Sequence, residues 1–451
     1  MPDKIKKFAM LLGDIAILYF SLYLKLLFRY REIPNSHIWN SHFTPFSLAF
    51  VGWILIFYIS NLYNLHLAVN TTQVLQLTMK ANIIAAALSA LFFYINPSIT
   101  IAPKTNLVIF LLISFVLIVI WRRIFNWLLY SYSPKQNIAV IGYNEQVKEL
   151  INIFNEKPYL GYNINLIFSD TNIDLKNITI SNEIENLKKL IEEKKVSTII
   201  LASDLQSSDE MRSMLFSCLP LKVNFVSLPN FYETITGKVP IEAINKMWFL
   251  ENLNEGNKTF FNFLKRFYDI ILALVVIGLT IIFWLPIALI IKLESKGPVF
   301  FKMKRYGKNK TEFSMLKFRT MREDGNTRAM TVHNDPRITR FGNFMRKTRI
   351  DELPQAINIL KGEMSFVGPR PERPELADEL EKKIPFFNER MLVKPGVTGA
   401  DQVSGEYHSP TEADTLKKLQ YDLFYIKNRS IYLDFSIILK TIATVLGQKG
   451  R

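Results

Sequence analysis

The chain has 451 residues, of which 49% are hydrophobic and 13% aromatic, so its length allows about three domains and its average composition conceals very apolar segments. The excess of 55 basic over 40 acidic residues gives a net charge of +15, which fits nucleic acid, an anionic membrane surface or phosphorylated substrates as partners. The single cysteine, Cys218, excludes an internal disulfide and a thiolate metal cluster, and the five histidines show no metal-ligand spacing.

Residues 1–130 read as a transmembrane region of four helices. Four apolar runs are each near the length that crosses a hydrocarbon core of about 30 Å. These runs are Phe8–Phe28, Phe46–Leu62, Val74–Tyr94 and Leu107–Trp121. Three charged residues lie in or beside these runs: Asp14, Lys25 and Lys80. Their side chains should face other helices or reach out to the membrane surface, and a proton or ion path is the less favoured interpretation.

The basic residues around these runs predict that both ends of the region lie in the cytoplasm. Lys4, Lys6 and Lys7 precede the first run, and Arg122 and Arg123 follow the fourth. Two arginines in the first loop, Arg29 and Arg31, argue the other way. With an even number of crossings, the basic residues before the first run and those after the fourth run lie on the same side of the membrane.

Residues 134–250 predict a middle α/β domain. Strand patterns interleave with helical spacing at Glu145–Phe154, which predicts a parallel, Rossmann-like sheet; the strands are expected at 137–142, 161–170, 197–203 and 222–229. The dinucleotide fingerprint is degraded, because Val147 stands where its third glycine belongs. We therefore expect a regulatory or assembly module, with nucleotide binding as the weaker alternative.

The apolar run Ile270–Ile291 has 22 residues without a charge, enough for an ordinary fifth crossing. Basic residues flank it on both sides, with Lys265 and Arg266 before it and Lys292 and Lys296 after it. This symmetry, together with Pro286 inside the run, favours a kinked re-entrant helix over about 267–292 that enters and leaves by the same face.

The stretch from Lys292 to Ile350 contains 16 basic and 5 acidic residues. Interleaved apolar residues and the lack of a nucleic-acid motif favour a membrane surface over nucleic acid. Some of these cations should face substrate phosphates, although for each one alone a structural salt bridge is an equal alternative; the candidates are Lys304, Arg305, Arg319, Arg337 and Arg340.

Two neighbouring acids, Asp351 and Glu352, stand before a short amphipathic helix with apolar residues at Leu353, Ala356, Ile357 and Leu360. At the amino end of a helix, the unpaired N–H groups and the dipole should keep a carboxylate ionised and attract phosphate. Asp351 is then a plausible nucleophile toward phosphorus, and Glu352 a metal ligand. The plain alternative is an N-cap followed by a first-turn acid.

A proline-framed arginine follows in Gly368–Pro371, where the fixed backbone would let Arg370 grip phosphate oxygens in two places. This segment belongs to a set of motifs: KFRTM from Lys317, NDPRITRFGNFMRKTRIDELPQ from Asn334, GEMSFVGPRPERPE from Gly362 and KPGVTG from Lys394. From about Lys265 onward the sequence resembles the bacterial sugar transferases, the polyprenyl-phosphate hexose-1-phosphate transferases.

The resemblance implies transfer of a sugar 1-phosphate from a UDP-sugar to polyprenyl phosphate at the membrane, with release of UMP. Asp351 would attack phosphorus and form an aspartyl-phosphosugar, and Glu352, with Asp351, would hold Mg²⁺ or Mn²⁺. The phosphate-binding arginine of the family falls on Arg370. Other expected substrate contacts are Arg319, Lys304, Arg305, Arg337, Lys394 and Asp434, the last with core capping as an equal alternative.

The resemblance also implies an architecture for residues 258–451: a mainly α, monotopic catalytic domain on the cytoplasmic face of a bacterial inner membrane. Nucleotide sugars are cytoplasmic, which supports the re-entrant helix. The middle region resembles the CoA-binding-like domain of larger family members, which suggest a homodimer. Two features depart from the family: the helix lacks a Ser-Pro pair, and Ala400 and Asp401 replace a Trp-Ala pair.

Two other functions remain open at this point. One is a catalytically inactive membrane scaffold for envelope polysaccharide assembly, against which the joint retention of Asp351, Glu352, Arg370 and Lys394 speaks. The other is a membrane-tethered nucleotide sensor that acts through the middle sheet, which the degraded fingerprint disfavours.

Overall fold

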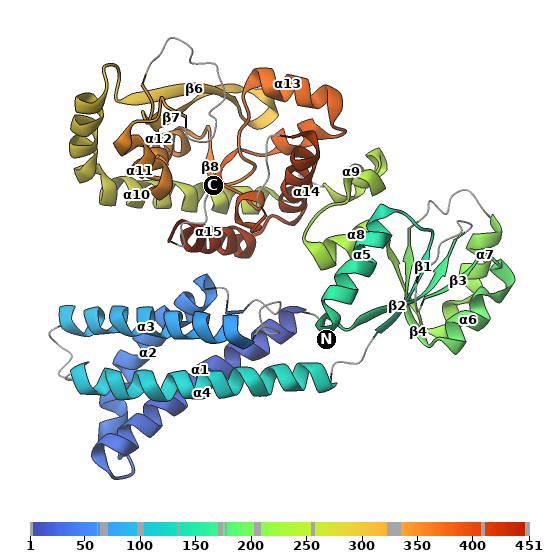
Figure 1. Ribbon diagram of the computed structural model, residues 1–451, viewed down its shortest axis with the longest axis horizontal. Coiled ribbons are helices and arrows are strands. Elements are labelled where there is room, and N and C mark those ends of the chain that lie inside the picture. The colour runs from blue at the N-terminus through green and yellow to red at the C-terminus, as the bar shows by residue number, and fades with distance from the viewer. Residues whose placement is uncertain are drawn as a thin grey trace. The chain divides into compact units, whose positions relative to one another are not determined.

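The computed structural model describes residues 3–60, 62–63, 71–96, 103–132, 136–169, 175, 178–202, 209–253, 258–322, 335–406 and 411–446. Its N-terminal part consists of long apolar helices (Figure 1), namely α1 (Asp3–Tyr30), α2 (Ser36–Ile59), α3 (Thr71–Ile95) and α4 (Pro103–Tyr132). Each is long and apolar enough to cross a bilayer. This makes the chain a membrane protein, while the number of crossings stays a prediction.

Aromatic side chains form the interior of this helical part. Phe46 and Phe50 of α2 lie against Phe110 of α4, with ring centroids 5.6 Å apart in both pairs. The charged Asp14 is buried, as predicted, and pairs with Arg122 at 2.6 Å between α1 and α4. The ammonium of Lys25 lies 4.9 Å from the centre of the Phe46 ring.

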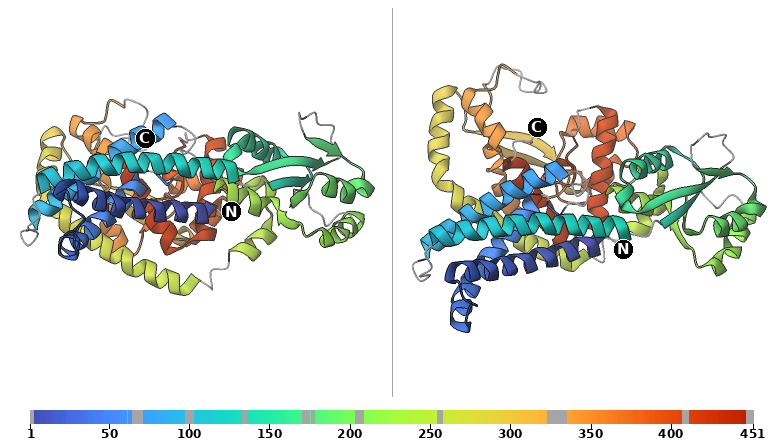
Figure 2. Two further views of the ribbon diagram at one scale, coloured as in Figure 1. Left: turned by 90° about the horizontal axis from the view of Figure 1, so that it is seen from below. Right: turned by 60° about the horizontal axis from the view of Figure 1, so that its bottom comes forward.

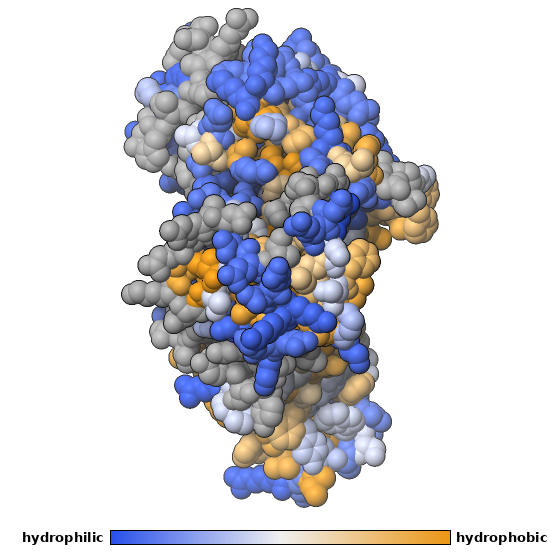
Figure 3. All heavy atoms as spheres, turned by 90° about the vertical axis from the view of Figure 1, so that its right-hand side faces the viewer, coloured by the Kyte–Doolittle hydropathy of each residue, from blue (hydrophilic) through white to orange (hydrophobic). Residues whose placement is uncertain are grey.

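The middle part contains a five-stranded sheet in the order β3-β2-β1-β4-β5, with β2 and β3 parallel. Helices flank the sheet (Figure 1), and hydrophilic side chains gather on the side of this domain that faces the viewer in Figure 3. The elements are β1 (Gln136–Ile141), α5 (Glu145–Glu156), β2 (Tyr162–Phe168), β3 (Thr179–Ser181), α6 (Leu187–Glu193), β4 (Val196–Leu201), α7 (Asp209–Ser217) and β5 (Asn224–Ser227).

The turn after β1, where the glycine fingerprint is degraded, carries a side-chain cap. Gly142 has φ of 93°, and the side chain of Asn144 accepts a hydrogen bond from the backbone N–H of Val147 at 3.0 Å. An N-terminal N–H of α5 is thus satisfied by the protein itself. The short edge strand β3, which has only three residues, was not predicted because it lacks a periodic pattern.

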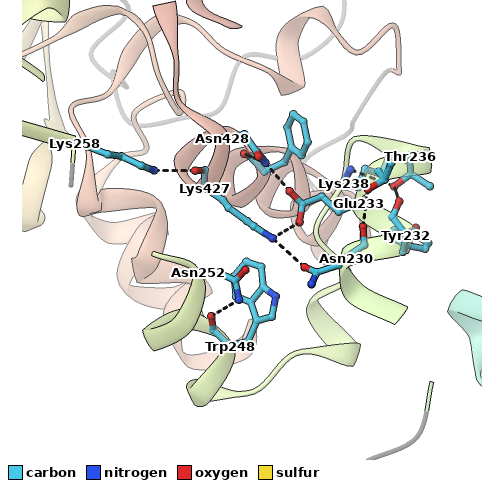
Figure 4. Close-up of polar contacts among 12 residues, drawn as sticks. Asn230, Tyr232, Glu233, Thr236, Lys238, Trp248, Asn252, Lys258, Lys427 and Asn428 are labelled. Carbon is cyan, nitrogen blue, oxygen red and sulfur yellow. Dashed lines mark hydrogen bonds and ion pairs between the residues drawn. The ribbon is translucent and has the colours of Figure 1, made fainter. Parts of the chain in front are cut away.

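Two helices after the sheet pack on the C-terminal domain. They are α8 (Leu228–Thr236) and α9 (Lys246–Asn252), and Val239 and Trp248 share a buried core with Leu423 and Tyr425 of α14 (Glu412–Asn428). Figure 4 shows Glu233 of α8 between Lys427 and Asn428, which donate to it at 2.7 and 2.5 Å. Residues 228–253 therefore extend the hydrophobic core of the C-terminal domain.

The C-terminal domain combines helices with two small sheets. An antiparallel hairpin joins β6 (Phe300–Tyr306) and β7 (Glu312–Phe318), and a parallel pair joins β8 (Ser365–Val367) and β9 (Gly396–Thr398). The helices are α10 (Thr259–Glu294), α11 (Arg340–Thr348), α12 (Gln355–Lys361), α13 (Pro374–Lys383), α14 and α15 (Ile431–Leu446).

Helix α10 packs along this domain with one face and exposes the other. Ala273 lies in a cluster with Phe313 and Ile359, and Ile291 lies in another with Phe318. The exposed face is strongly apolar and includes Leu279, Ile282, Leu285, Leu289 and Leu293. The ribbon changes direction along its length (Figure 2), as a proline inside the helix favours. The re-entrant path stays a prediction.

Candidate active site

The two acids lie in a 3-10 turn, Ile350–Glu352, between α11 and α12. Arg349, with φ of 59°, ends α11 and turns the chain into this segment. Pro354 then precedes α12, and Gly362 ends that helix with φ of 85°, as predicted. The predicted apolar stripe is only partly right: Ala356 is buried, but α12 also buries Asn358 and Ile359, because the helix is enclosed on several sides.

Glu352 is surrounded by positive charge. Its Oε1 lies 2.7 Å from Lys317 Nζ, 3.2 Å from an Arg370 nitrogen and 3.6 Å from an Arg349 nitrogen. Burial opposes ionisation, but the charges of Lys317, Arg370 and Arg349 outweigh it and hold the pKa of Glu352 well below its usual range. Glu352 is therefore a fixed negative charge that gathers three cations at one point.

Asp351 has the opposite electrostatic environment. It is 7% exposed, and its Oδ1 has no hydrogen-bond partner among the described residues. Burial raises the pKa of Asp351, although Lys317 acts against this shift. The pKa of Asp351 thus shifts upward, not downward as an acid stabilised by the helix end would, because Asp351 precedes α12 and loses its water without gaining a hydrogen bond from the helix. An unpartnered buried oxygen is available to a reacting group.

Arg370 is held beside these acids by tightly packed backbone. A Cβ atom on Gly368 would lie 2.4 Å from the backbone oxygen of Lys394, so only glycine fits there. The backbone N–H of Gly396 donates to the Pro369 oxygen, and that of Gly368 to the Thr398 oxygen, both at 2.9 Å. The KPGVTG turn thus holds the loop that bears Arg370.

Arg319 and Arg337 have other surroundings. Arg319 is buried and donates to the Ser295 backbone oxygen at 2.7 Å, while its Nε and Nη1 lack hydrogen-bond partners within the described ranges. Arg337 makes two bonds to Asp335, at 2.9 and 2.6 Å. The first arginine has donors to spare for an anion, and the second already has a carboxylate partner.

The remaining predicted contacts are not all gathered at the acids. Lys304 is exposed and pairs with Glu312 at 3.0 Å, across the hairpin. Arg305 pairs with Glu372 at 3.8 Å, and burial lowers its pKa to about 10. Lys394 Nζ lies beside Gly362, at the end of α12 that is farther from Asp351 along the chain.

Asp434 is enclosed in a polar network between α10, α14 and α15. Its Oδ1 accepts from Tyr425 at 2.8 Å, and its Oδ2 accepts from Lys265 and Tyr268. Tyr425 also lies 3.1 Å from the Val367 backbone oxygen. This network supports the core-capping alternative for Asp434, since both carboxylate oxygens already have donors.

Two site residues were missed at the level of sequence. Lys317 and Arg349 both contact Glu352, yet only the motif around Lys317 was singled out. The signal for Lys317 was a lysine between the apolar residues Leu316 and Phe318 of a strand, where a cation needs a buried partner. Arg349 stands three residues before Glu352, a spacing that brings helical side chains together.

The fit of the site to a divalent ion rests on two carboxylates. No group of three or more His, Cys, Asp or Glu residues that could hold a metal occurs among the described residues. Asp351 and Glu352 alone are the right chemistry for Mg²⁺, which commonly binds one or two carboxylates and completes its shell with water and substrate phosphates. The unpartnered Oδ1 of Asp351 fits such a ligand.

Comparison with known proteins identifies the family. A family model described as "Bacterial sugar transferase" matches residues 260–448, and a "CoA-binding domain" model matches residues 58–229. A UDP-glucose:undecaprenyl-phosphate glucose-1-phosphate transferase of Xanthomonas campestris is 34% identical over 70% of this chain and 67% of the relative. The chain belongs to the bacterial sugar transferases. The resemblance read from its motifs is confirmed, and the protein is a transferase.

Two further relatives of this transferase differ in their named sugar. The Escherichia coli enzyme of the same name is 31% identical over 70% of this chain and 69% of the relative. A UDP-N-acetylgalactosamine-undecaprenyl-phosphate N-acetylgalactosaminephosphotransferase of Aeromonas hydrophila is 38% identical, but the chain spans only 58% of its length and 54% of this chain is matched. The match to the CoA-binding model begins at residue 58 and so includes α3 and α4 as well as the sheet.

Proposed function

We propose that this transferase moves a sugar 1-phosphate from a UDP-sugar to undecaprenyl or another polyprenyl phosphate, and releases UMP. The names of the relatives support the donor and acceptor classes. The observation that carries the proposal is the pair of acids: a buried Asp351 with an unpartnered oxygen stands next to a Glu352 that holds three cations. The site therefore joins a nucleophile to positive charge.

The reaction proceeds in two displacements. A carboxylate oxygen of Asp351 attacks the phosphorus that bears the sugar, the bond from this phosphorus to the bridging oxygen breaks, and UMP leaves with the electron pair. The polyprenyl phosphate oxygen then attacks the same phosphorus, and the Asp351 carboxylate leaves. The products are polyprenyl-diphosphate-sugar and the free enzyme.

The cations stabilise charge on the transferring group. Arg370 is fixed by its loop and by Glu352, and Arg319 has unused donors, so both offer preorganised guanidinium groups to phosphate oxygens. Lys317 holds Glu352 and, through it, the geometry of the turn that bears Asp351. Glu352 and Asp351 would hold Mg²⁺ or Mn²⁺, which supplies neutralisation of the diphosphate and of the departing UMP.

The membrane arrangement is part of the proposal. We infer four crossings in the N-terminal part, a re-entrant α10 and a catalytic domain on the cytoplasmic face of a bacterial inner membrane. The apolar exposed face of α10 and the large apolar residues exposed on α15, Tyr432 and Ile442 among them, suit contact with lipid. A homodimer stays a prediction from the larger family members.

The test is release of UMP by the detergent-solubilised full chain. UDP-glucose, UDP-galactose and N-acetylated or deoxygenated UDP-amino sugars are supplied in turn, each with and without undecaprenyl phosphate. We expect multiple turnovers with at least one sugar only when the lipid is present, and none with Asp351→Asn. Failure of every sugar to release UMP above a control without enzyme would support the inactive scaffold instead.

A further inference from the structure

A buried arginine outside the predicted site contacts the backbone of Arg370. Arg390 is 7% exposed and lies in the 3-10 segment Phe387–Leu392. One of its terminal nitrogens, Nη2, donates to the Arg370 backbone oxygen at 3.0 Å and lies 2.7 Å from a carboxylate oxygen of Asp422. The other, Nη1, lies 3.8 Å from Glu372. The guanidinium thus connects three segments that are distant in sequence.

Arg390 holds this loop by its backbone, whereas Glu352 holds the side chain of Arg370. Arg370 turns its guanidinium to Glu352, while Arg390 binds its carbonyl. Glu372, two residues further on, lies between Arg390 and Arg305, at 3.8 Å from each. A loop held by its carbonyl, by a following side chain and by its glycine packing has little freedom to move the Arg370 guanidinium.

The partner of Arg390 is also buried and well anchored. Asp422 is 2% exposed and lies on α14, whose carboxyl end is bound to α8 through Glu233. Besides Arg390, the charged groups that act on Asp422 are Asp401 and Glu372. A buried arginine needs a carboxylate partner, since an unpaired charge in the interior is costly. Asp422 therefore supplies the charge that keeps Arg390 in place.

We propose that Arg390 and Asp422 are positioning residues of the transfer reaction: they hold the backbone of Arg370 so that its guanidinium meets the donor phosphates. The planar guanidinium fork suits this task, because a single group reaches a carbonyl and two carboxylates at fixed angles. Lysine at position 390 would keep the charge but lose the fork. This inference rests on the proposed role of Arg370.

The test is a double-mutant cycle in the full chain, with UMP release measured as a function of UDP-sugar concentration. The variants are Arg370→Lys, Arg390→Lys, the double variant and Asp422→Asn, with Lys383→Gln as control, since Lys383 is exposed and pairs only with Glu379 in the described structure. If Arg390 acts through Arg370, Arg390→Lys lowers kcat/KM about ten- to hundredfold, and the double variant loses no more than Arg370→Lys alone.

Other outcomes separate this inference from the proposed function. Losses that multiply in the double variant would show that Arg390 acts independently of Arg370 and would overturn the inference. So would an Arg390→Lys enzyme with unchanged kcat/KM while Arg370→Lys is impaired. If Arg370→Lys itself is silent, the proposed role of Arg370 fails. Should Arg390→Lys not fold, the near-isosteric Asp422→Asn must still lower kcat/KM more than Lys383→Gln, and equality of these two variants refutes the inference.

Discussion

Replacement of Glu352 by glutamine tests the electrostatic arrangement of the site. The change removes one negative charge and leaves Lys317, Arg370 and Arg349 facing one another around a neutral amide. Loss of one partner from a buried ion pair costs about 3–5 kcal/mol, and the lower end applies here because glutamine still accepts a hydrogen bond. In a domain of this size, about 3 kcal/mol corresponds to a decrease of roughly 6–12 °C in unfolding temperature.

Thermal unfolding of the detergent-solubilised full chain measures the loss of stability in Glu352→Gln. Hydrogen exchange of peptides around residues 349–362 shows whether the loss is located at the site. Glu379→Gln is the matched control, because Glu379 is 60% exposed and pairs with Lys383 on α13. Equal shifts for Glu352→Gln and Glu379→Gln would refute the reasoning. The pKa of Glu352 is lowered from 4.5, so its contribution is complete above that pH and is lost only as the pH falls further.

Three further predictions follow from the same geometry. Because burial raises the pKa of Asp351 above 3.8, the rate of the UMP-releasing step should fall with pH before an ordinary aspartate would protonate, and a rate that is flat down to pH 4 would contradict this. Burial raises the pKa of Asp422 from 3.8 to about 6. The free energy of unfolding of the wild type should therefore fall by roughly 3 kcal/mol, relative to Asp422→Asn, as the pH rises from 3.8 to about 6. Unfolding free energies of the two proteins that change in parallel with pH would contradict this shift. Chelation with EDTA should abolish UMP release and Mg²⁺ or Mn²⁺ should restore it, whereas full activity in EDTA would remove the metal from the proposal.

The apolar helices and the middle sheet could be predicted because their signals are local. Runs of about 20 apolar residues indicate the long helices, and buried strands separated by helical spacing indicate the sheet. The three-residue strand β3 is too short to carry such a signal. The packing of Trp248 against α14 could not be predicted from the sequence either. Hydrophobic spacing shows that a face is buried, but it does not show which element covers that face.

In the site, the motifs indicated Asp351, Glu352 and Arg370, while their electrostatics depended on tertiary contacts. The position of Asp351 before α12 suggested an ionised carboxylate, yet burial without a hydrogen-bond partner shifts its pKa upward. Lys317 and Arg390 were missed because their partners, Glu352 and the Arg370 backbone, lie 35 and 20 residues away. The close packing of Gly396 against the backbone of Gly368 is likewise a tertiary contact that no local pattern shows.

Covalent labelling tests the central chemistry most directly. The full chain is incubated with its UDP-sugar and divalent ion in the absence of polyprenyl phosphate, quenched in acid and analysed by peptide mass spectrometry. The account predicts one equivalent of UMP and a sugar-phosphate adduct on the peptide that contains Asp351, which disappears when polyprenyl phosphate is added. An enzyme that turns over with lipid but never carries this adduct, or an Asp351→Asn enzyme that retains normal turnover, would contradict it.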